Sequence, residues 1–149
     1  MWSFTAAVRP AVYTHHGPFI SRSTFDRLLG LAPSPANALE FCAGTLQEMA
    51  GADVYEVADR YSRERAIAYV HCRNVVGKVP NYREVFIDEG DMDALRLLRV
   101  LHRNGFDGVV IHDRAPQMAC DSPWHAGVAH ALGYLRAALT GIGPGKTKD

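Results

Sequence analysis

The sequence has no long apolar run and no excess of charge of either sign. Its 16 basic and 16 acidic side chains give a formal net charge of zero, so it lacks the basic surplus that favours nucleic acid or anionic membranes. It has no run of about 18–20 apolar residues, the length of a membrane span. Residues 1–10 lack the charged start and apolar core of a secretory signal. We therefore expect a protein that binds neither nucleic acid nor membranes.

Cysteine is scarce, and two common site motifs are missing. The three cysteines, Cys42, Cys72 and Cys120, are an odd number and widely spaced. This spacing predicts no disulfide framework and favours a reducing, cytoplasmic location. The sequence also has no glycine-rich phosphate loop and no GxSxG nucleophile elbow.

The sequence does contain an alternation of apolar strands and amphipathic helices. Its 149 residues are enough for one domain with a core. Strands are predicted at residues 38–42, 66–71 and 108–113. Helices are predicted from Val54, from an Asp91 cap and from Pro123 to about Leu139, after a shorter helix with a capping-box-like start at Ser23 and Asp26. We expect residues 1–20 to be irregular and residues 141–149 to form a disordered tail.

Alternating strands and helices are typical of βαβ units with a parallel sheet and right-handed crossovers. A complete (β/α)8 barrel needs about 250 residues. This chain has room for three or four βα units. It is therefore either a small open α/β sheet or a piece of a barrel.

Three predicted strands end in residues that can bind a metal: Cys42, His71 and Asp113. The carboxyl ends of parallel strands meet at one edge of a sheet, where active sites of such folds lie. Thiolate, imidazole and carboxylate together suit a divalent transition metal with an open coordination position. Such an ion can polarise an oxygen of a substrate.

Each of the three residues also has a purely structural interpretation. Cys42 would then be an inert buried thiol, and His71 a hydrogen-bonded histidine at a strand end. Asp113 would cap a helix or a loop. The position of the three residues at strand ends does not by itself distinguish these structural interpretations from a metal site.

Several motifs, in order, resemble those of the mannonate dehydratase family. Residues 34–49 (SPANALEFCAGTLQEM) resemble its cysteine-bearing segment, and residues 69–75 (YVHCRNV) its histidine-bearing strand. Further matches are residues 84–93 (EVFIDEGDMD), 105–113 (GFDGVVIHD), 116–118 (PQM), 121–124 (DSPW) and 131–134 (ALGY).

The resemblance implies a xylose-isomerase-like (β/α)8 TIM barrel, of which residues 21–140 would be the C-terminal three to four βα units. It implies a hydro-lyase that converts D-mannonate to 2-keto-3-deoxygluconate in glucuronate catabolism, with Fe2+ or Mn2+. The family's cysteine, histidine and aspartate ligands correspond to Cys42, His71 and Asp113. Catalytic roles are implied for Asp113, for Arg73 in the histidine-bearing motif and for His130, which lies near a family tyrosine.

The sequence also departs from the family pattern. A family His-Pro-Asp-Asp-Pro motif, which carries a further histidine ligand, would lie just before Trp2, and Arg114 replaces a residue that is often histidine. Two hypotheses follow. The chain is a hydro-lyase, active alone or completed by another chain, for example as a homo-oligomer. Alternatively it is a non-catalytic remnant that binds metal or pairs with another chain.

Overall fold

The computed structural model describes residues 22–143. The predicted irregular segment at residues 1–20 lies outside these residues, as do residues 144–149 of the predicted tail. The elements in order are α1 (Arg22–Leu31), β1 (Leu39–Cys42), α2 (Ala43–Glu48), α3 (Val54–Arg63), β2 (Ile67–His71), β3 (Asn74–Lys78), β4 (Asn81–Val85), α4 (Ala94–Arg103), β5 (Val109–Ile111) and α5 (Pro123–Ile142).

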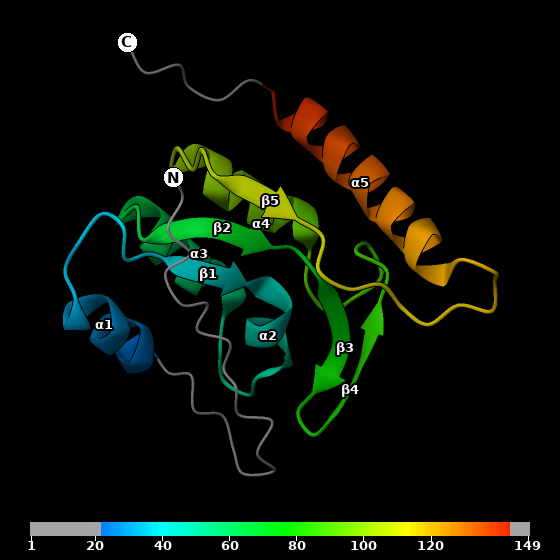
Figure 1. Ribbon diagram of the computed structural model, residues 1–149, viewed down its shortest axis with the longest axis horizontal. Coiled ribbons are helices and arrows are strands. Elements are labelled where there is room, and N and C mark those ends of the chain that lie inside the picture. The colour runs from blue at the N-terminus through cyan, green and yellow to red at the C-terminus, as the bar shows by residue number, and fades with distance from the viewer. Residues whose placement is uncertain (1–21, 144–149) are drawn as a thin grey trace.

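The centre of the fold is a three-stranded parallel sheet in the order β1-β2-β5. Helices α3 and α4 lie behind this sheet, and α5 runs past the β5 side (Figure 1). A separate antiparallel hairpin, β3-β4, projects beyond the end of β2. The expected α/β class with a parallel sheet is confirmed. The part of the chain that the structure describes forms no closed barrel.

One face of the sheet is buried against the helices. Leu39, Phe41 and Val70 point into this core, and α3 and α4 contribute Tyr61 and Leu97. Both helices have a periodic apolar side, as expected for helices that cover one face of a sheet. They also begin with aspartate N-caps, which accept hydrogen bonds from otherwise unpaired backbone N–H groups.

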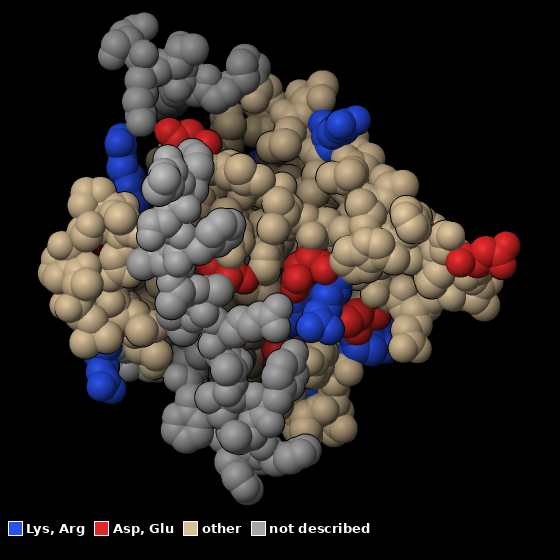
Figure 2. All heavy atoms as spheres, in the orientation of Figure 1, with Lys and Arg blue, Asp and Glu red and all other residues tan. Residues whose placement is uncertain are grey.

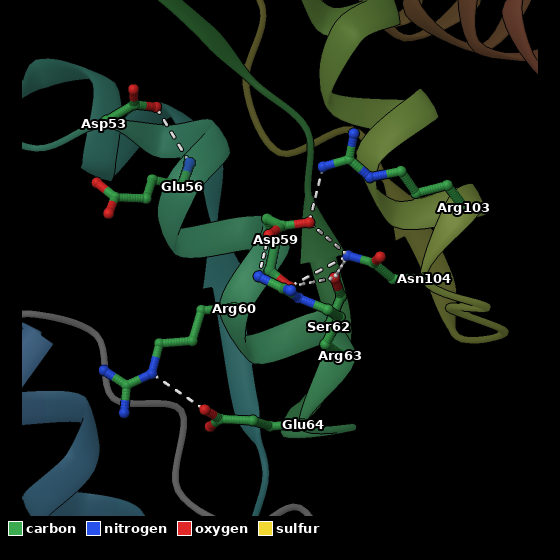
Figure 3. Close-up of polar contacts among 9 residues, drawn as sticks. All are labelled: Asp53, Glu56, Asp59, Arg60, Ser62, Arg63, Glu64, Arg103 and Asn104. Atoms are coloured by element: carbon green, nitrogen blue, oxygen red, sulfur yellow. Dashed lines mark hydrogen bonds and ion pairs between the residues drawn. The ribbon is translucent and has the colours of Figure 1, made fainter.

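The outer sides of α3 and α4 are joined through the Asp59 carboxylate. Asp59 Oδ1 accepts hydrogen bonds from Arg103 at 2.7 Å and from the Asn104 side chain at 3.0 Å (Figure 3). Asn104 also donates to Ser62 Oγ at 2.9 Å. Gly105 follows with φ +71°, a left-handed conformation that ends the helix as expected.

A β-bulge in β2 decides which side chains face the core. Leu39 pairs with Ile67, but the next residue, Glu40, pairs with Tyr69, so Ala68 is an extra residue in the ladder. The extra residue resets the alternation. Ile67 therefore stays in the core, while Tyr69 turns to the same face as Glu40.

The opposite face of the sheet carries partly exposed apolar side chains beside polar ones. Val109 and Ile111 are the register partners of Tyr69 and His71 and share this face with them. They are 62% and 37% exposed. In a closed barrel this face would point inward. None of the helices in the described residues is long and apolar enough to cross a membrane.

Two expected helix starts are wrong. α1 begins at Arg22, so Ser23 is already inside the helix, and the Asp26 carboxylate instead accepts hydrogen bonds from Arg60 and Tyr61. The N-cap of α4 is Asp93, not Asp91. Asp91 accepts a hydrogen bond from the Gly77 backbone N–H at 2.8 Å, because it faces the unpredicted hairpin.

Other differences lie in short elements and boundaries. The sequence did not indicate the short helix α2 or the β3-β4 hairpin, which occupies the place of a predicted loop around Pro80. Strand β5 is shorter than expected and ends at Ile111. α5 begins at Pro123 as predicted but continues to Ile142, which is inside the expected tail.

We predict that the isolated chain is poorly stable and self-associates. Within residues 22–143, β1 and β5 are edge strands, and unpaired edges beside an exposed apolar face favour association. Size-exclusion chromatography over a range of protein concentrations, with thermal unfolding, measures this. A monodisperse monomer with a sharp cooperative transition would contradict the prediction.

Candidate metal centre

The structure brings Cys42, His71 and Asp113 together at the carboxyl ends of the three parallel strands. One ligand atom from each lies within 4.8 Å of those of the other two. Cys42 and His71 are register partners in β1 and β2, and Asp113 follows β5, whose Ile111 is the partner of His71. Acidic and basic side chains gather close to this place on the exposed face (Figure 2).

The Cys42 thiol lies among groups that stabilise its charged form. The Thr45 hydroxyl donates a hydrogen bond to Cys42 Sγ at 3.0 Å. Burial raises the pKa of the thiol, but hydrogen bonding with His71, the charge of Arg73 and the Thr45 hydroxyl lower it by more. The net pKa of Cys42 lies below its ordinary value, and the thiolate is the form that binds a metal.

His71 lies between carboxylates. Its Nδ1 is 3.0 Å from Glu40 Oε1 and 3.9 Å from Asp113 Oδ2. The hydrogen bond with Cys42 raises the pKa of His71 most strongly, and the charges of Asp113 and Glu40 raise it further, whereas burial lowers it. The hydrogen bond between the two side chains thus lowers the pKa of the Cys42 thiol and raises the pKa of the His71 imidazole.

Arg73 lies under this cluster, with only 3% of its surface exposed. Its guanidinium donates hydrogen bonds to Glu84 at 2.6 Å, Glu48 at 2.8 Å and Thr45 at 3.1 Å. Its Nε is 3.6 Å from Asp113 Oδ2. Because these N–H groups are occupied by protein partners, the arrangement favours a role in positioning neighbouring residues.

Gly44 leaves the space that the Arg73 side chain fills. A Cβ at this position would lie 2.4 Å from Arg73 Cγ, far inside van der Waals contact. Burial lowers the pKa of the guanidinium, but the negative charges of Cys42 and Glu48 raise it by more. Arg73 is therefore a permanent positive charge beside the thiolate.

The chemistry of the donor set fits a divalent transition metal. Thiolate, imidazole and carboxylate are the ligands that such ions take in proteins. The inert-thiol interpretation fits Cys72 better than Cys42, because Cys72 is fully buried and burial raises its pKa to about 12. Asp113 does not cap α5, whose N-cap is Ser122.

Other sequence candidates lie outside this cluster. His130 Nε2 is 2.9 Å from Asp88 Oδ1, and its ring lies 4.7 Å from that of Phe86. His112 packs beside Trp124, with ring centroids 5.4 Å apart. The structure therefore does not bring His130 to the three converging groups.

The sequence pattern did not indicate four residues that contact the predicted site residues: Glu40, Thr45, Glu48 and Glu84. Glu40 had a readable signal, because it lies two residues before Cys42 and so shares its strand face. The two glutamates that pair with Arg73 lie on α2 and β4, the unpredicted elements. These two glutamates could be recognised as partners of Arg73 only once the positions of α2 and β4 were known.

A family model described as D-mannonate dehydratase (UxuA) matches residues 19–142. The chain belongs to the mannonate dehydratase family. The match covers all of the described strands together with Cys42, His71 and Asp113, so the expected family is confirmed.

Curated relatives in this family are distant and longer. The mannonate dehydratase of Lactococcus lactis subsp. cremoris is 29% identical over 98 residues, which are 62% of this chain and 27% of that protein. The protein from Geobacillus thermodenitrificans is 23% identical over 96 residues, or 62% of this chain and 26% of its own. The chain thus spans about a quarter of the length of the curated relatives it matches.

A solved structure has the same fold. The crystal structure of mannonate dehydratase from Streptococcus suis serotype 2 superimposes with a TM-score of 0.71 at 19% sequence identity. The likeness covers 88% of this chain and 42% of that one.

We predict that Cys42 in the metal-free protein is alkylated at lower pH than an ordinary thiol, whose pKa is about 8.5. The experiment uses a Cys120→Ser background, because Cys120 is exposed and Cys72 is buried. The rate of iodoacetamide modification against pH gives the midpoint. His71→Ala should move the midpoint upward, and an unchanged midpoint would contradict the proposed stabilisation of the thiolate.

Proposed function

We propose that this chain carries the metal-binding part of an active site that removes water from D-mannonate. The observation that supports this most directly is the convergence of Cys42, His71 and Asp113 in a member of the mannonate dehydratase family. We propose these three side chains as the protein ligands of the ion. Fe2+ and Mn2+ are the metals that we expect there.

In the proposed reaction, C2 of D-mannonate loses its proton and C3 loses its hydroxyl as water. The resulting enol becomes the C2 ketone of 2-keto-3-deoxygluconate, so atoms and charge balance. When bound, the divalent ion would supply Lewis-acid stabilisation of the charge that develops beside the substrate carboxylate. Arg73 holds the carboxylate of Asp113 and, through the Thr45 hydroxyl, the sulfur of Cys42 in fixed positions.

We also propose that the sheet is a segment of a (β/α)8 barrel, with residues 21–140 as the barrel part. The face of the sheet opposite α3 and α4 carries Glu40, Cys42 and His71, and a barrel wall facing these residues would enclose the sugar acid. In this proposal another copy or another chain completes the site, and the reaction belongs to glucuronate catabolism in the cytoplasm.

A second candidate function is that of a non-catalytic remnant, which at most binds metal or pairs with another chain. Two observations favour it. Val109 is 62% exposed on the face that would enclose substrate. His130, the expected proton donor, is paired with Asp88.

We predict that the purified chain binds Mn2+ through Cys42 but alone forms little or no product from D-mannonate. Metal binding requires only the three converging residues, whereas turnover requires groups that position substrate and transfer protons. Equilibrium dialysis and an assay for 2-keto-3-deoxygluconate measure the two properties, with Cys42→Ala as control. Cys42-independent metal binding would overturn the proposed site. Turnover at ordinary enzyme rates that is lost in Cys42→Ala would exclude the remnant.

His130 is tested separately, by His130→Gln, in any preparation that shows turnover. If His130 donates a proton to the leaving hydroxyl, kcat should fall by about 100- to 10,000-fold, the typical contribution of an acid–base group. Metal affinity should not change, because His130 contacts Asp88 and not the metal-binding residues. A kcat within a few-fold of the parent would remove His130 from the mechanism.

A further inference from the structure

A groove of about 540 Å³ runs between α3 and α4, on the side of these helices away from the sheet. Six charged side chains line its walls: an acidic row of Asp53, Glu56 and Asp59 from α3 and its N-cap, and a basic row of Arg96, Arg99 and Arg103 from α4. The groove contains none of the residues of the candidate metal centre, and the proposed reaction does not use it.

The two walls of the groove have opposite charge. Members of the acidic row are three residues apart along α3, and members of the basic row are three and four residues apart along α4. Residues at this spacing lie along one side of a helix, as the acidic row does in Figure 3. The groove is therefore neutral as a whole but strongly polar from one wall to the other.

The two rows lie side by side along their length. α3 leads from β1 to β2 and α4 leads to β5, and these strands are parallel, so the two helices run in the same direction. Near the start of both helices, the Arg96 guanidinium lies 3.8 Å from the centre of the Tyr55 ring. Further along, Arg103 donates a hydrogen bond to Asp59 Oδ1 at 2.7 Å. The middle members of the two rows therefore lie at similar heights in the groove.

The interactions within the chain leave part of this charge available to a partner. Arg99 is exposed and makes no hydrogen bond or ion pair within residues 22–143. Arg103 pairs with Asp59, but its side chain is 63% exposed. Exposed ion pairs are weak because water screens them, so an opposing charged surface can compete for the same groups.

We propose that this groove is an interface between two copies of the chain, in which the acidic row of each copy faces the basic row of the other. A twofold interface uses the same surface on both copies. A twofold axis along the groove exchanges the two walls and keeps each residue at its height, so Glu56 of one copy lies opposite Arg99 of the other at two equivalent contacts. An axis across the groove would place each row against itself, which repulsion between like charges disfavours.

A second copy fits both walls, whereas a simple ion fits only one. An anion at the basic row would lie beside the carboxylates of the acidic row, and a cation at the acidic row would lie beside the guanidinium groups. The groove also lies on the opposite side of α3 and α4 from the sheet. This contact is therefore distinct from association through the edges of β1 and β5 and from any chain that covers the exposed face of the sheet.

The test reverses one charge in each row, with Glu56→Lys and Arg99→Glu. Each variant alone should dimerise at least about tenfold more weakly than the parent, because both attractive contacts become repulsive. An equimolar mixture of the two variants should recover the affinity of the parent, since opposite charges then face each other at both contacts. The double variant should recover it by itself. Sedimentation velocity over a range of concentrations measures each dissociation constant.

Two control variants make the same charge changes outside the groove. They are Glu64→Lys, which changes a carboxylate paired with Arg60, and Arg136→Glu, which changes an exposed residue of α5. Circular dichroism checks that every variant folds, and Glu56→Gln replaces Glu56→Lys if the lysine variant does not. Salt gives a second readout, because the screening length falls from about 10 Å at 0.1 M to about 3 Å at 1 M. Salt should dissociate this dimer, whereas association through apolar side chains should persist.

Three outcomes would overturn the interface. They are a parent that stays monomeric at low salt, reversals that dimerise as strongly as their controls, and a mixture that dimerises no more strongly than the separate variants. Mn2+ binding through Cys42 should be equal in all of these variants, because none of the changed residues belongs to the candidate metal centre. The interface and the proposed metal site can therefore fail independently.

Discussion

The ion pairs of the buried Arg73 guanidinium are the interactions on which the proposed metal site depends. It joins α2 through Glu48, the hairpin through Glu84 and the loop after β5 through Asp113. Removing one partner of a buried ion pair leaves the other charge unpaired, which is strongly destabilising. Because Arg73 connects three short segments, it helps to fix their relative positions and places a positive charge beside the Cys42 sulfur.

Strand register supplies the second constraint. Cys42 and His71 are opposite each other because the bulge at Ala68 shifts β2 by one residue. Without that extra residue, alternation would carry either Ile67 or His71 to the wrong face. The core requires Ile67 to face the helices, whereas the candidate site requires His71 to lie on the opposite face. The bulge makes both orientations possible in one strand.

The sequence predicted the three strands of the parallel sheet and the longer helices well, because their patterns of apolar residues are clear. It also placed Cys42, His71 and Asp113 at strand ends, because that requires only the order of the elements. It did not reveal α2, the hairpin or the Asp93 cap. The hairpin depends on non-local contacts, such as the hydrogen bonds that the Asn74 side chain donates to the backbone carbonyls of Ile87 and Met92. Because Glu48 and Glu84 lie on α2 and β4, the sequence also could not identify them as partners of Arg73.

The proposed metal binding and the proposed substrate binding depend on different parts of the structure. The three converging side chains come from successive βα units, so local connections within the chain are sufficient to bring them together. Enclosing a sugar acid requires a wall opposite the exposed face of the sheet, where Val109 and Ile111 have no covering element within the described residues. The proposed metal binding therefore depends on contacts that this chain makes by itself, whereas the proposed catalysis depends on what covers that face. Because the two requirements lie in different parts of the structure, loss of one would not entail loss of the other.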